Sequence, residues 1–293
     1  MQRAHTAGMM TAPTHGHQRS TDWDAFSANY HAESVTPFAR GVRFRLRSDL
    51  KTLIAEWRNS ERRRRVFVDF GCGPGDALEC VAGSVPLSVG IDFAPKMLAL
   101  AAERLTRRRV WVRRCSARVG YERVCKASDA TLGSPSNEKE TLLVRGELRD
   151  LSSIRGCVDA ATSINSICAS NTRDATRMFR EMARSIRPGG LFYCVWPAVE
   201  SLSYLHDLER RAGDPPEARN ERLLRNGVHV DATGYTLKLF SRQEIERLCE
   251  QSRLRVEVLE ELRYPWSYMS RLGWGAFAGK PPLWDWYTIA RAI

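Results

Sequence analysis

The feature that most constrains the fold is a pair of short apolar runs that each lead into an aspartate. The first, residues 66–70, contains Asp69 and ends in a turn with three alternating glycines, and the second, residues 87–91, is followed directly by Asp92. Runs that are apolar at consecutive positions indicate strands buried on both faces, as in parallel sheets. A glycine turn after one such strand and an acid after the next, about twenty residues later, are typical of a nucleoside-binding site at the carboxyl edge of a sheet.

Strand and helix patterns alternate along most of the chain, which indicates a parallel α/β sheet. Further strands are predicted at 142–146, 157–162, 191–196, 254–260 and 286–292, and helices at 38–57, 75–81, 94–105, 173–186 and 242–251. Residues 110–112 compete with 142–146 as the third strand, and the sequence leaves this choice open. The final two strands are joined more tightly than the others, which predicts an antiparallel pair. Ser241, followed three residues later by Glu244, is predicted to cap the last helix.

We predict one domain, residues 21–293, behind a disordered tail at 1–20. Two segments depart from the strand–helix pattern. Residues 107–140 are rich in arginine, contain a Gly-Ser-Pro-Ser-Asn run and show little periodicity, so we expect an insertion that is mostly loop. Residues 197–240 follow the fifth strand without a strong period, and we expect them to form a lid or substrate segment.

Net charge and the arrangement of the cysteines limit the binding partners and the cellular compartment that we expect. The net charge is +11, and arginines cluster within 40–65 and 107–123, a balance that invites a nucleic-acid interpretation. A solvated basic face on an ordinary enzyme is the simpler interpretation, and we favour it. The eight cysteines are scattered without a CxxC pair, so we expect neither a metal site nor a disulfide framework, and a reducing, cytoplasmic location.

No membrane or secretory segment is predicted. No apolar run reaches the roughly 20 residues that a spanning helix needs, and the N-terminus lacks the apolar core of a secretory signal. The acid-free start with serine and threonine leaves an organelle transit peptide open. The oligomeric state is open as well.

Charge around the glycine turn narrows the type of ligand. Asp69 precedes the turn, Asp76 follows it, and the third glycine, Gly75, comes two residues after the second. Two carboxylates at this position would repel a pyrophosphate and favour a ligand that carries an ammonium or a sulfonium group. S-adenosylmethionine carries both, and its ribose hydroxyls would find an acceptor in Asp92. The alternative role of Asp92 is to cap the helix that follows it.

Five segments in this order resemble the motifs of class I S-adenosylmethionine-dependent methyltransferases: 69–75, 90–98, 144–151, 158–166 and 187–190. The resemblance implies a Rossmann-like, doubly wound α/β fold. In that fold, helices cover both faces of a mostly parallel, seven-stranded sheet whose last strand is antiparallel. The resemblance also implies S-adenosyl-L-methionine as the cofactor, S-adenosyl-L-homocysteine as its product, and no metal.

The same motifs imply which residues bind the cofactor. They are Asp69, Gly71, Cys72, Gly73, Asp92, Phe93, Met97, Glu147, Leu148 and Asn165. Phe93 is expected beside the adenine. An acid of the third motif is expected to accept from the adenine amino group; Glu147 and Asp150 compete for this role, and we favour Glu147 although most relatives have aspartate there. Asn165 and Ser163 are expected near the methionine end, with loop capping as their alternative role.

We therefore expect a methyltransferase that acts on a small or medium-sized metabolite by in-line displacement at the sulfonium carbon. The alternatives are an RNA methyltransferase of the tRNA type, which would use the arginine clusters for phosphate contacts, and a non-catalytic cofactor-binding protein of the same fold.

No catalytic residue is assigned from the sequence. His206 and His229 are candidate bases, and neither is chosen. Tyr30 and His31 are candidates to close over the cofactor. A group of C-terminal aromatic residues either lines a substrate pocket or packs in the core: Tyr264, Trp266, Tyr268, Trp274, Trp284 and Trp286. For Trp284 and Trp286 we favour packing.

Overall fold

A computed structural model of the 293-residue chain describes residues 19–58, 65–129, 139–214, 216, 218–230, 236–272, 277 and 279–293. The predicted tail before residue 19, three arginines of the first basic cluster and Trp274 lie outside these ranges. The strands are β1 (Val66–Phe70), β2 (Leu87–Asp92), β3 (Val112–Ser116), β4 (Glu140–Arg145), β5 (Val158–Ile164), β6 (Ile186–Pro197), β7 (Val228–Val230), β8 (Thr236–Lys238), β9 (Leu254–Tyr264) and β10 (Leu283–Ala292).

Helices surround these strands, and three short 3₁₀ turns complete the described part of the chain. The helices are α1 (Ser20–Phe26), α2 (Tyr30–Glu33), α3 (Leu46–Arg58), α4 (Pro95–Arg107), α5 (Ala117–Asp129), α6 (Thr172–Ser185), α7 (Val199–Arg211), α8 (Ala218–Arg225), α9 (Arg242–Gln251) and α10 (Trp266–Met269). The 3₁₀ turns are η1 (Leu78–Cys80), η2 (Ser152–Ile154) and η3 (Ser270–Leu272).

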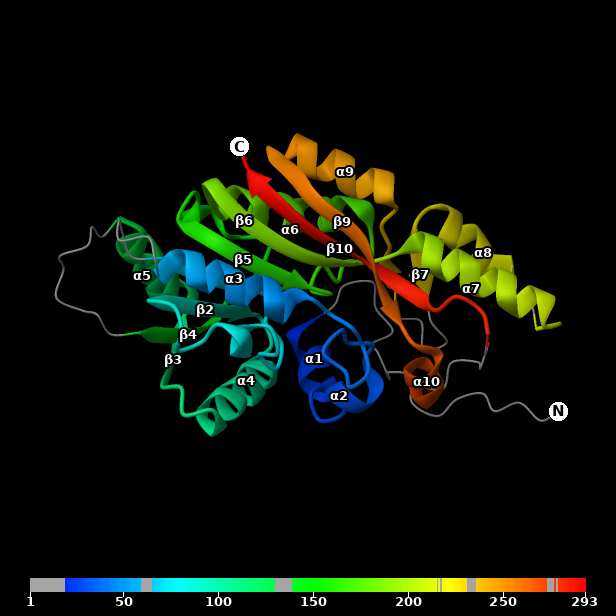
Figure 1. The fold of residues 1–293 in the computed structure, drawn as a ribbon, viewed down its shortest axis with the longest axis horizontal. Helices are drawn as coiled ribbons and strands as arrows, with labels where there is room; N and C mark the ends of the chain where they lie inside the picture. The colour runs from blue at the N-terminus through cyan, green and yellow to red at the C-terminus, as the bar shows by residue number, and fades with distance from the viewer. Residues whose placement is uncertain are drawn as a thin grey trace.

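The main sheet has eight strands in the order β3-β4-β2-β1-β5-β6-β10-β9 (Figure 1). All neighbours from β3 to β6 are parallel, and β10 is antiparallel both to β6 and to β9. The predicted Rossmann-like, mostly parallel sheet with an antiparallel end is therefore confirmed. The predicted count of seven strands was wrong by one: the segment 142–146 largely forms β4, and a further strand, β3, begins at the last residue of the competing segment 110–112. β4 takes the place beside β2, and β3 adds an outer edge.

The prediction that residues 107–140 are mostly loop was wrong for residues 112–129, which form β3 and α5; the Gly-Ser-Pro-Ser-Asn run lies outside the described residues. α5 buries Tyr121, Val124 and Ala127, which are three residues apart and pack into the core. Its Gly120 brings the helix close to the sheet, because a Cβ at that position would come within 2.4 Å of a methyl of Val144. The arginines that hid this pattern in the sequence lie on exposed positions of β3 and α5.

Two predicted helices are shorter than expected. α3 begins at Leu46 and not at residue 38, because Gly41 has a left-handed φ of +93° that interrupts a helix. The apolar residues before it follow an irregular path, on which Phe38 packs against Phe44 and Phe44 packs against Tyr287. The helix predicted at 75–81 is reduced to η1.

The remaining predicted elements are present. The helix at 94–105 falls within α4 apart from its first residue, the helix at 173–186 corresponds to α6, and the two C-terminal strands correspond to β9 and β10. Ser241 caps α9, since its Oγ accepts from the backbone N–H of Glu244 at 3.1 Å. Within the described ranges, no helix combines the length and the apolar composition that a bilayer span requires.

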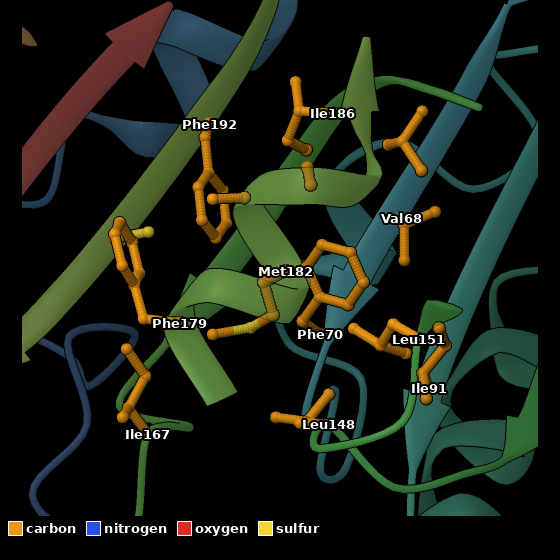
Figure 2. Packing of buried hydrophobic residues seen from close by; sticks show 14 of the residues in the cluster. Val68, Phe70, Ile91, Leu148, Leu151, Ile167, Phe179, Met182, Ile186 and Phe192 are labelled. Carbon is orange, nitrogen blue, oxygen red and sulfur yellow. The ribbon is translucent and has the colours of Figure 1, made fainter. Parts of the chain in front are cut away.

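The sheet separates two apolar layers. One contains the buried faces of α5, α6 and α9, and the other contains those of α3, α4 and α7. β1 is buried at every position, because its side chains enter both layers alternately. Figure 2 shows Phe179 and Met182 of α6 pointing toward the sheet in the first layer. The ring of Phe179 stacks on Phe192, with centroids 5.9 Å apart, and lies 4.8 Å from the ring of Trp196.

We predict that Phe179→Ala lowers the free energy of unfolding by about 3–5 kcal/mol, because it removes a fully buried ring and leaves a cavity between α6 and β6. Urea unfolding followed by circular dichroism measures this change. Trp111→Ala is the matched control: Trp111 is 69% exposed, so its loss is expected to change the same quantity by less than about 0.5 kcal/mol. A small effect at Phe179 would show that α6 contributes little to the core.

Candidate functional site

The main cavity lies where β1, β2, β4 and β5 end, at the carboxyl edge of the sheet. It encloses about 900 Å³ including its open mouth. Its lining residues come from the turns after these strands and from α1, α2, α4 and α6: Trp23, Tyr30, Gly71, Gly73, Asp92, Phe93, Met97, Glu147, Leu148, Arg149, Ile164, Asn165, Ser166, Cys168, Ala169, Ser170, Asp174 and Met178. A smaller cavity of about 360 Å³ adjoins it and shares Tyr30, Gly71, Ile164 and Asn165 as walls.

All ten residues predicted to bind a cofactor lie in the lining of these two cavities. Asp69 and Cys72 line the smaller one, Gly71 and Asn165 line both, and the remaining six line the main cavity. The sequence motifs therefore assemble at one place, although they are spread over nearly a hundred residues.

The glycine turn after β1 forms the floor of both cavities. Gly71 and Gly73 have left-handed φ values of +63° and +50°, which side chains rarely adopt. At Gly71 a Cβ would lie 2.4 Å from the Cβ of Ser166, so only glycine allows the turns after β1 and β5 to approach this closely. Because the helix predicted after this turn is absent, the turn does not present a helix N-terminus to an anion.

Asp92 holds the turn to the end of β2. Its Oδ2 accepts from the backbone N–H of Gly73 at 2.9 Å, and its Oδ1 accepts from that of Ala94 at 2.8 Å. Asp92 does not cap α4, whose N-cap is Ala94 without a side-chain hydrogen bond; it instead holds the turn before this helix, while it still lines the main cavity. Burial raises the pKa of Asp92 to about 6, partly offset by its backbone hydrogen bonds.

Asp69 is the more deeply buried acid. Its side chain is 2% exposed, and its Oδ1 accepts from the hydroxyl of Thr162 at 2.7 Å. The other oxygen, Oδ2, is buried without a hydrogen-bond partner among the described residues. Burial raises the pKa of Asp69 to about 7. A donor supplied by a ligand in the smaller cavity would satisfy this oxygen.

Two further walls of the main cavity contain residues that the sequence motifs predicted. Phe93 and Met97 come from the end of β2 and from α4, and Glu147 and Leu148 come from the turn after β4. The competing acid of that turn, Asp150, is exposed, accepts from the hydroxyl of Ser152 and does not line the cavity. Of the two competing acids, Glu147 therefore lines the cavity and Asp150 does not.

Asn165 follows β5 in a strained conformation. Its φ of +50° is in the left-handed region, where asparagine is tolerated better than most residues. Its Nδ2 donates to Asp285 of β10 at 3.4 Å, and its Oδ1 is buried without a partner among the described residues. Ser163 does not line either cavity; its Oγ lies 2.6 Å from the Oγ of Ser166.

The N-terminal segment covers the two cavities. Trp23 and Tyr30 line the main cavity, and residues 35–38 line the smaller one. The segment is attached to α4, since Asp24 accepts from the backbone N–H of Lys96 at 2.7 Å. It is also attached to α10, where the hydroxyl of Tyr268 donates to the carbonyl of Ser34 and accepts from the N–H of Thr36.

The predicted lid at 197–240 does not provide this cover, because no described residue of that range lines either cavity. His206 is buried on α7, and His229 lies on β7. Neither candidate base therefore reaches the site. Tyr30 does, as the sequence suggested.

The C-terminal aromatic residues that the structure describes do not line the cavities either. Trp284 and Trp286 pack together with ring centroids 6.4 Å apart, as the sequence interpretation favoured. Tyr264 and Tyr268 also pack in the second apolar layer.

Acids dominate the lining of the site in an otherwise basic protein. Arg149 is the cation among the described lining residues. Five carboxylates line the two cavities: Asp69, Asp76, Asp92, Glu147 and Asp174. Asp76 is paired with Arg104, and Glu147 lies 3.4 Å from Arg149. The remaining acids give the site a negative potential, although the whole chain carries +11. Such a site favours a cation over a phosphate.

Sequence reasoning missed the lining residues beyond the motifs. Ser170, Asp174 and Met178 lie in and before α6, where the helical pattern was recognised but the direction of each face was not. Trp23 stands in a segment without a motif, so its place over the site depends on the packing of α1 against α4. Ser166 is the last residue of the fourth motif, and the glycine at position 71 could have indicated that another segment approaches the turn closely.

Residues 68–194 match a family model described as a methyltransferase domain. This match confirms the resemblance to class I S-adenosylmethionine-dependent methyltransferases over the segment that holds most of the site. Among curated proteins, none matches the sequence.

Solved structures show the same fold at low sequence identity. A protein from Methanosarcina mazei, described as a SAM-dependent methyltransferase, is 16% identical, with a TM-score of 0.51 over 81% of this chain and 97% of its own. Magnesium protoporphyrin IX methyltransferase from Synechocystis, solved with bound SAH, is 12% identical, with a TM-score of 0.52 over 94% and 95%. The cyclase SpnF is 15% identical, with a TM-score of 0.56 over 98% and 99%. Because one neighbour is described as a cyclase, the fold alone does not determine the reaction.

We predict that Asp69→Asn changes how stability depends on pH. The folded-state pKa of Asp69, about 7, lies above its ordinary value of 3.8, so the folded state holds this proton more tightly than the unfolded state. The resulting stability is fully present below about pH 4 and is lost as the pH rises through 7. Between pH 4 and pH 8 the unliganded wild type should therefore lose roughly 2–4 kcal/mol of unfolding free energy relative to the variant.

Urea unfolding of both proteins at a series of pH values measures this difference. Asp92 and Asp285 also titrate in this range, but they are present in both proteins and cancel in the comparison. If the unfolding free energies of the two proteins changed with pH in parallel, burial would not raise the pKa of Asp69 in the folded protein.

Proposed function

We propose that this protein, which carries a methyltransferase domain at residues 68–194, binds S-adenosylmethionine in the main cavity and methylates a small or medium-sized metabolite. The observation that carries the proposal is the acidic lining together with two buried acceptor atoms that lack donors, Asp69 Oδ2 and Asn165 Oδ1. A ligand with an ammonium group satisfies both atoms, whereas a pyrophosphate would satisfy neither.

The lining residues fit the parts of this cofactor. Asp92 would accept from the ribose hydroxyls, since its carboxylate is already oriented by two backbone N–H groups. Glu147 would accept from the adenine amino group, with Phe93 and Met97 as the apolar wall. Asp69 and Asn165 would accept from the methionine ammonium, because both line the smaller cavity where it adjoins the main one.

When bound, the cofactor supplies a methyl group that its sulfonium already activates. The chain's own task is then to orient the acceptor in line and to exclude water. Tyr30 and residues 35–38 cover the site and are positioned for this task. Burial and the neighbouring acids raise the pKa of Tyr30, so its hydroxyl stays neutral and is a hydrogen-bonding group rather than a base at neutral pH.

The cover of the smaller cavity supports an acceptor of small or medium size. Its outer wall is apolar, formed by Val35, Pro37 and Phe38, and Tyr30 lies where the two cavities adjoin. A covered, partly apolar site suits a compact organic molecule better than a folded macromolecule.

Calorimetry with S-adenosylmethionine and S-adenosylhomocysteine tests the cofactor assignment. We predict that wild type binds both and that Asp92→Ala weakens binding by about 1–3 kcal/mol, because hydroxyls of the ribose lose their acceptor. Asp150→Asn is the matched control, since this acid lies on the same edge of the sheet but outside the cavity. Circular dichroism shows that each variant is folded, which matters because Asp92 also holds the backbone at Gly73 and Ala94. Folded wild type that binds neither ligand would refute the proposal.

An RNA substrate is the second candidate, and one observation favours it. Trp111 is 69% exposed at the start of β3, and Arg109, Arg113 and Arg114 beside it are exposed and have no carboxylate partner among the described residues. Exposed aromatic and basic residues together are typical of single-stranded nucleic-acid binding.

Labelled methyl groups distinguish the two candidates. After incubation with methyl-labelled S-adenosylmethionine and a cell extract, we predict that label enters the small-molecule fraction and not RNA. RNA binding should also be weak, with little change between low and moderate salt. Label in RNA, together with binding that weakens steeply with salt and is reduced by Trp111→Ala, would favour the second candidate.

A further inference from the structure

Three polar side chains from separate parts of the chain meet behind the smaller cavity. The hydroxyl of Tyr264, at the end of β9, donates to Asp285 Oδ2 at 2.6 Å, and Asn165 Nδ2 donates to the same oxygen at 3.4 Å. Asn165 also hydrogen-bonds the phenol of Tyr264, and the backbone of Ala198 donates to Asp285. Asn165 lines both cavities, whereas Asp285 and Tyr264 line neither.

This arrangement determines which end of the Asn165 amide faces the ligand. An asparagine side chain can turn over and exchange its oxygen with its NH₂ group at little cost unless its neighbours distinguish them. An ionised carboxylate only accepts hydrogen bonds, so Asp285 binds the NH₂ end and disfavours the reversed amide. The oxygen of Asn165 is then the end of the amide that Asp285 does not bind; it is buried and lacks a donor among the described residues.

We propose that Asp285 and Tyr264 are positioning residues that hold the Asn165 amide with its oxygen toward the ammonium group of the cofactor. This inference rests on the proposed function of the main cavity. It adds two residues of the C-terminal hairpin, which lie outside the matched segment 68–194, to the machinery of the site.

The ionisation of Asp285 agrees with this role. Burial raises its pKa to about 6, and the hydrogen bonds from Tyr264 and Asn165 partly offset that increase. The carboxyl is therefore mostly ionised above neutral pH and accepts from both neighbours. Asp69 also lines the smaller cavity, and its Oδ2 is the second buried acceptor without a donor among the described residues, so a ligand group with several N–H donors suits this pair of residues. An ammonium has three such donors.

The test compares two probes that differ at the methionine end. S-adenosylhomocysteine carries the ammonium, and 5′-methylthioadenosine has the same adenosine and thioether but lacks the amino-acid part. We expect Asp285→Ala to weaken the binding of S-adenosylhomocysteine about tenfold and that of 5′-methylthioadenosine less than twofold, since the loss of a charge-assisted acceptor is felt only by the ammonium. Tyr264→Phe is expected to act in the same direction, about threefold. Calorimetry at pH 8 measures all four values.

Tyr287→Phe is the matched control. Tyr287 lies on the same strand as Asp285, is buried, and also donates to an aspartate, Asp49, at 2.7 Å. Neither residue of that pair lines either cavity, so the variant should bind both probes as wild type does. It reports any general weakening of the sheet that the loss of a buried tyrosine hydroxyl causes.

The outcomes distinguish a failure of the positioning assignment from a failure of the proposed function. Equal weakening of both probes by Asp285→Ala and Tyr264→Phe would show a merely structural role and overturn the positioning assignment alone. Unchanged binding of both probes in both variants would overturn it as well. Failure of folded wild type to bind either probe would overturn the proposed function, and the positioning assignment with it. Tyr264→Phe, which removes one atom, keeps the test valid if Asp285→Ala does not fold.

Discussion

The site depends on carboxylates that are held at the carboxyl edge of the sheet with little water around them. Asp69 and Asp92 are less than a tenth exposed, and burial raises the pKa of each by two units or more. A buried charge without a full set of partners destabilises the fold, so these residues cost stability in the absence of a ligand. A cation that satisfies them recovers that free energy on binding. The same burial that weakens the empty protein therefore makes the cavity selective for a positively charged ligand.

Much of the fold could be predicted, because its central strands are short, apolar and ordered along the chain. The elements that could not be predicted are those whose pattern is formed by tertiary contacts. β3 is an edge strand with exposed arginines, so it shows no apolar run, and α5 buries a face that its arginines conceal. The helix expected from residue 38 failed for the opposite reason: Phe38 and Phe44 are apolar because they pack irregularly against Tyr287, and helical spacing arose by coincidence.

The candidate site was predicted to the extent that its residues stand in motifs. Asp69, Asp92 and Asn165 each follow or end a predicted strand, and parallel strands bring such positions to one edge. Trp23 and residues 35–38 could not be found this way, since nothing local in their sequence indicates the surface that they cover. The lid was predicted after the fifth strand because the sequence pattern of that segment is irregular. An irregular pattern does not indicate where the segment packs in the fold. The attachments of Asp24 and Tyr268 decide which segment does so.

The parts outside the matched residues 68–194 complete the candidate site. The matched segment supplies the acids and the glycine turn. The N-terminal segment supplies the cover, and the hairpin of β9 and β10 supplies Tyr264 and Asp285 behind Asn165. The network from α10 to the cover and the network from β10 to Asn165 start from the same C-terminal region, since Tyr264 and Tyr268 are four residues apart and pack together. The cover and the orientation of Asn165 therefore both depend on neighbouring residues of one C-terminal region.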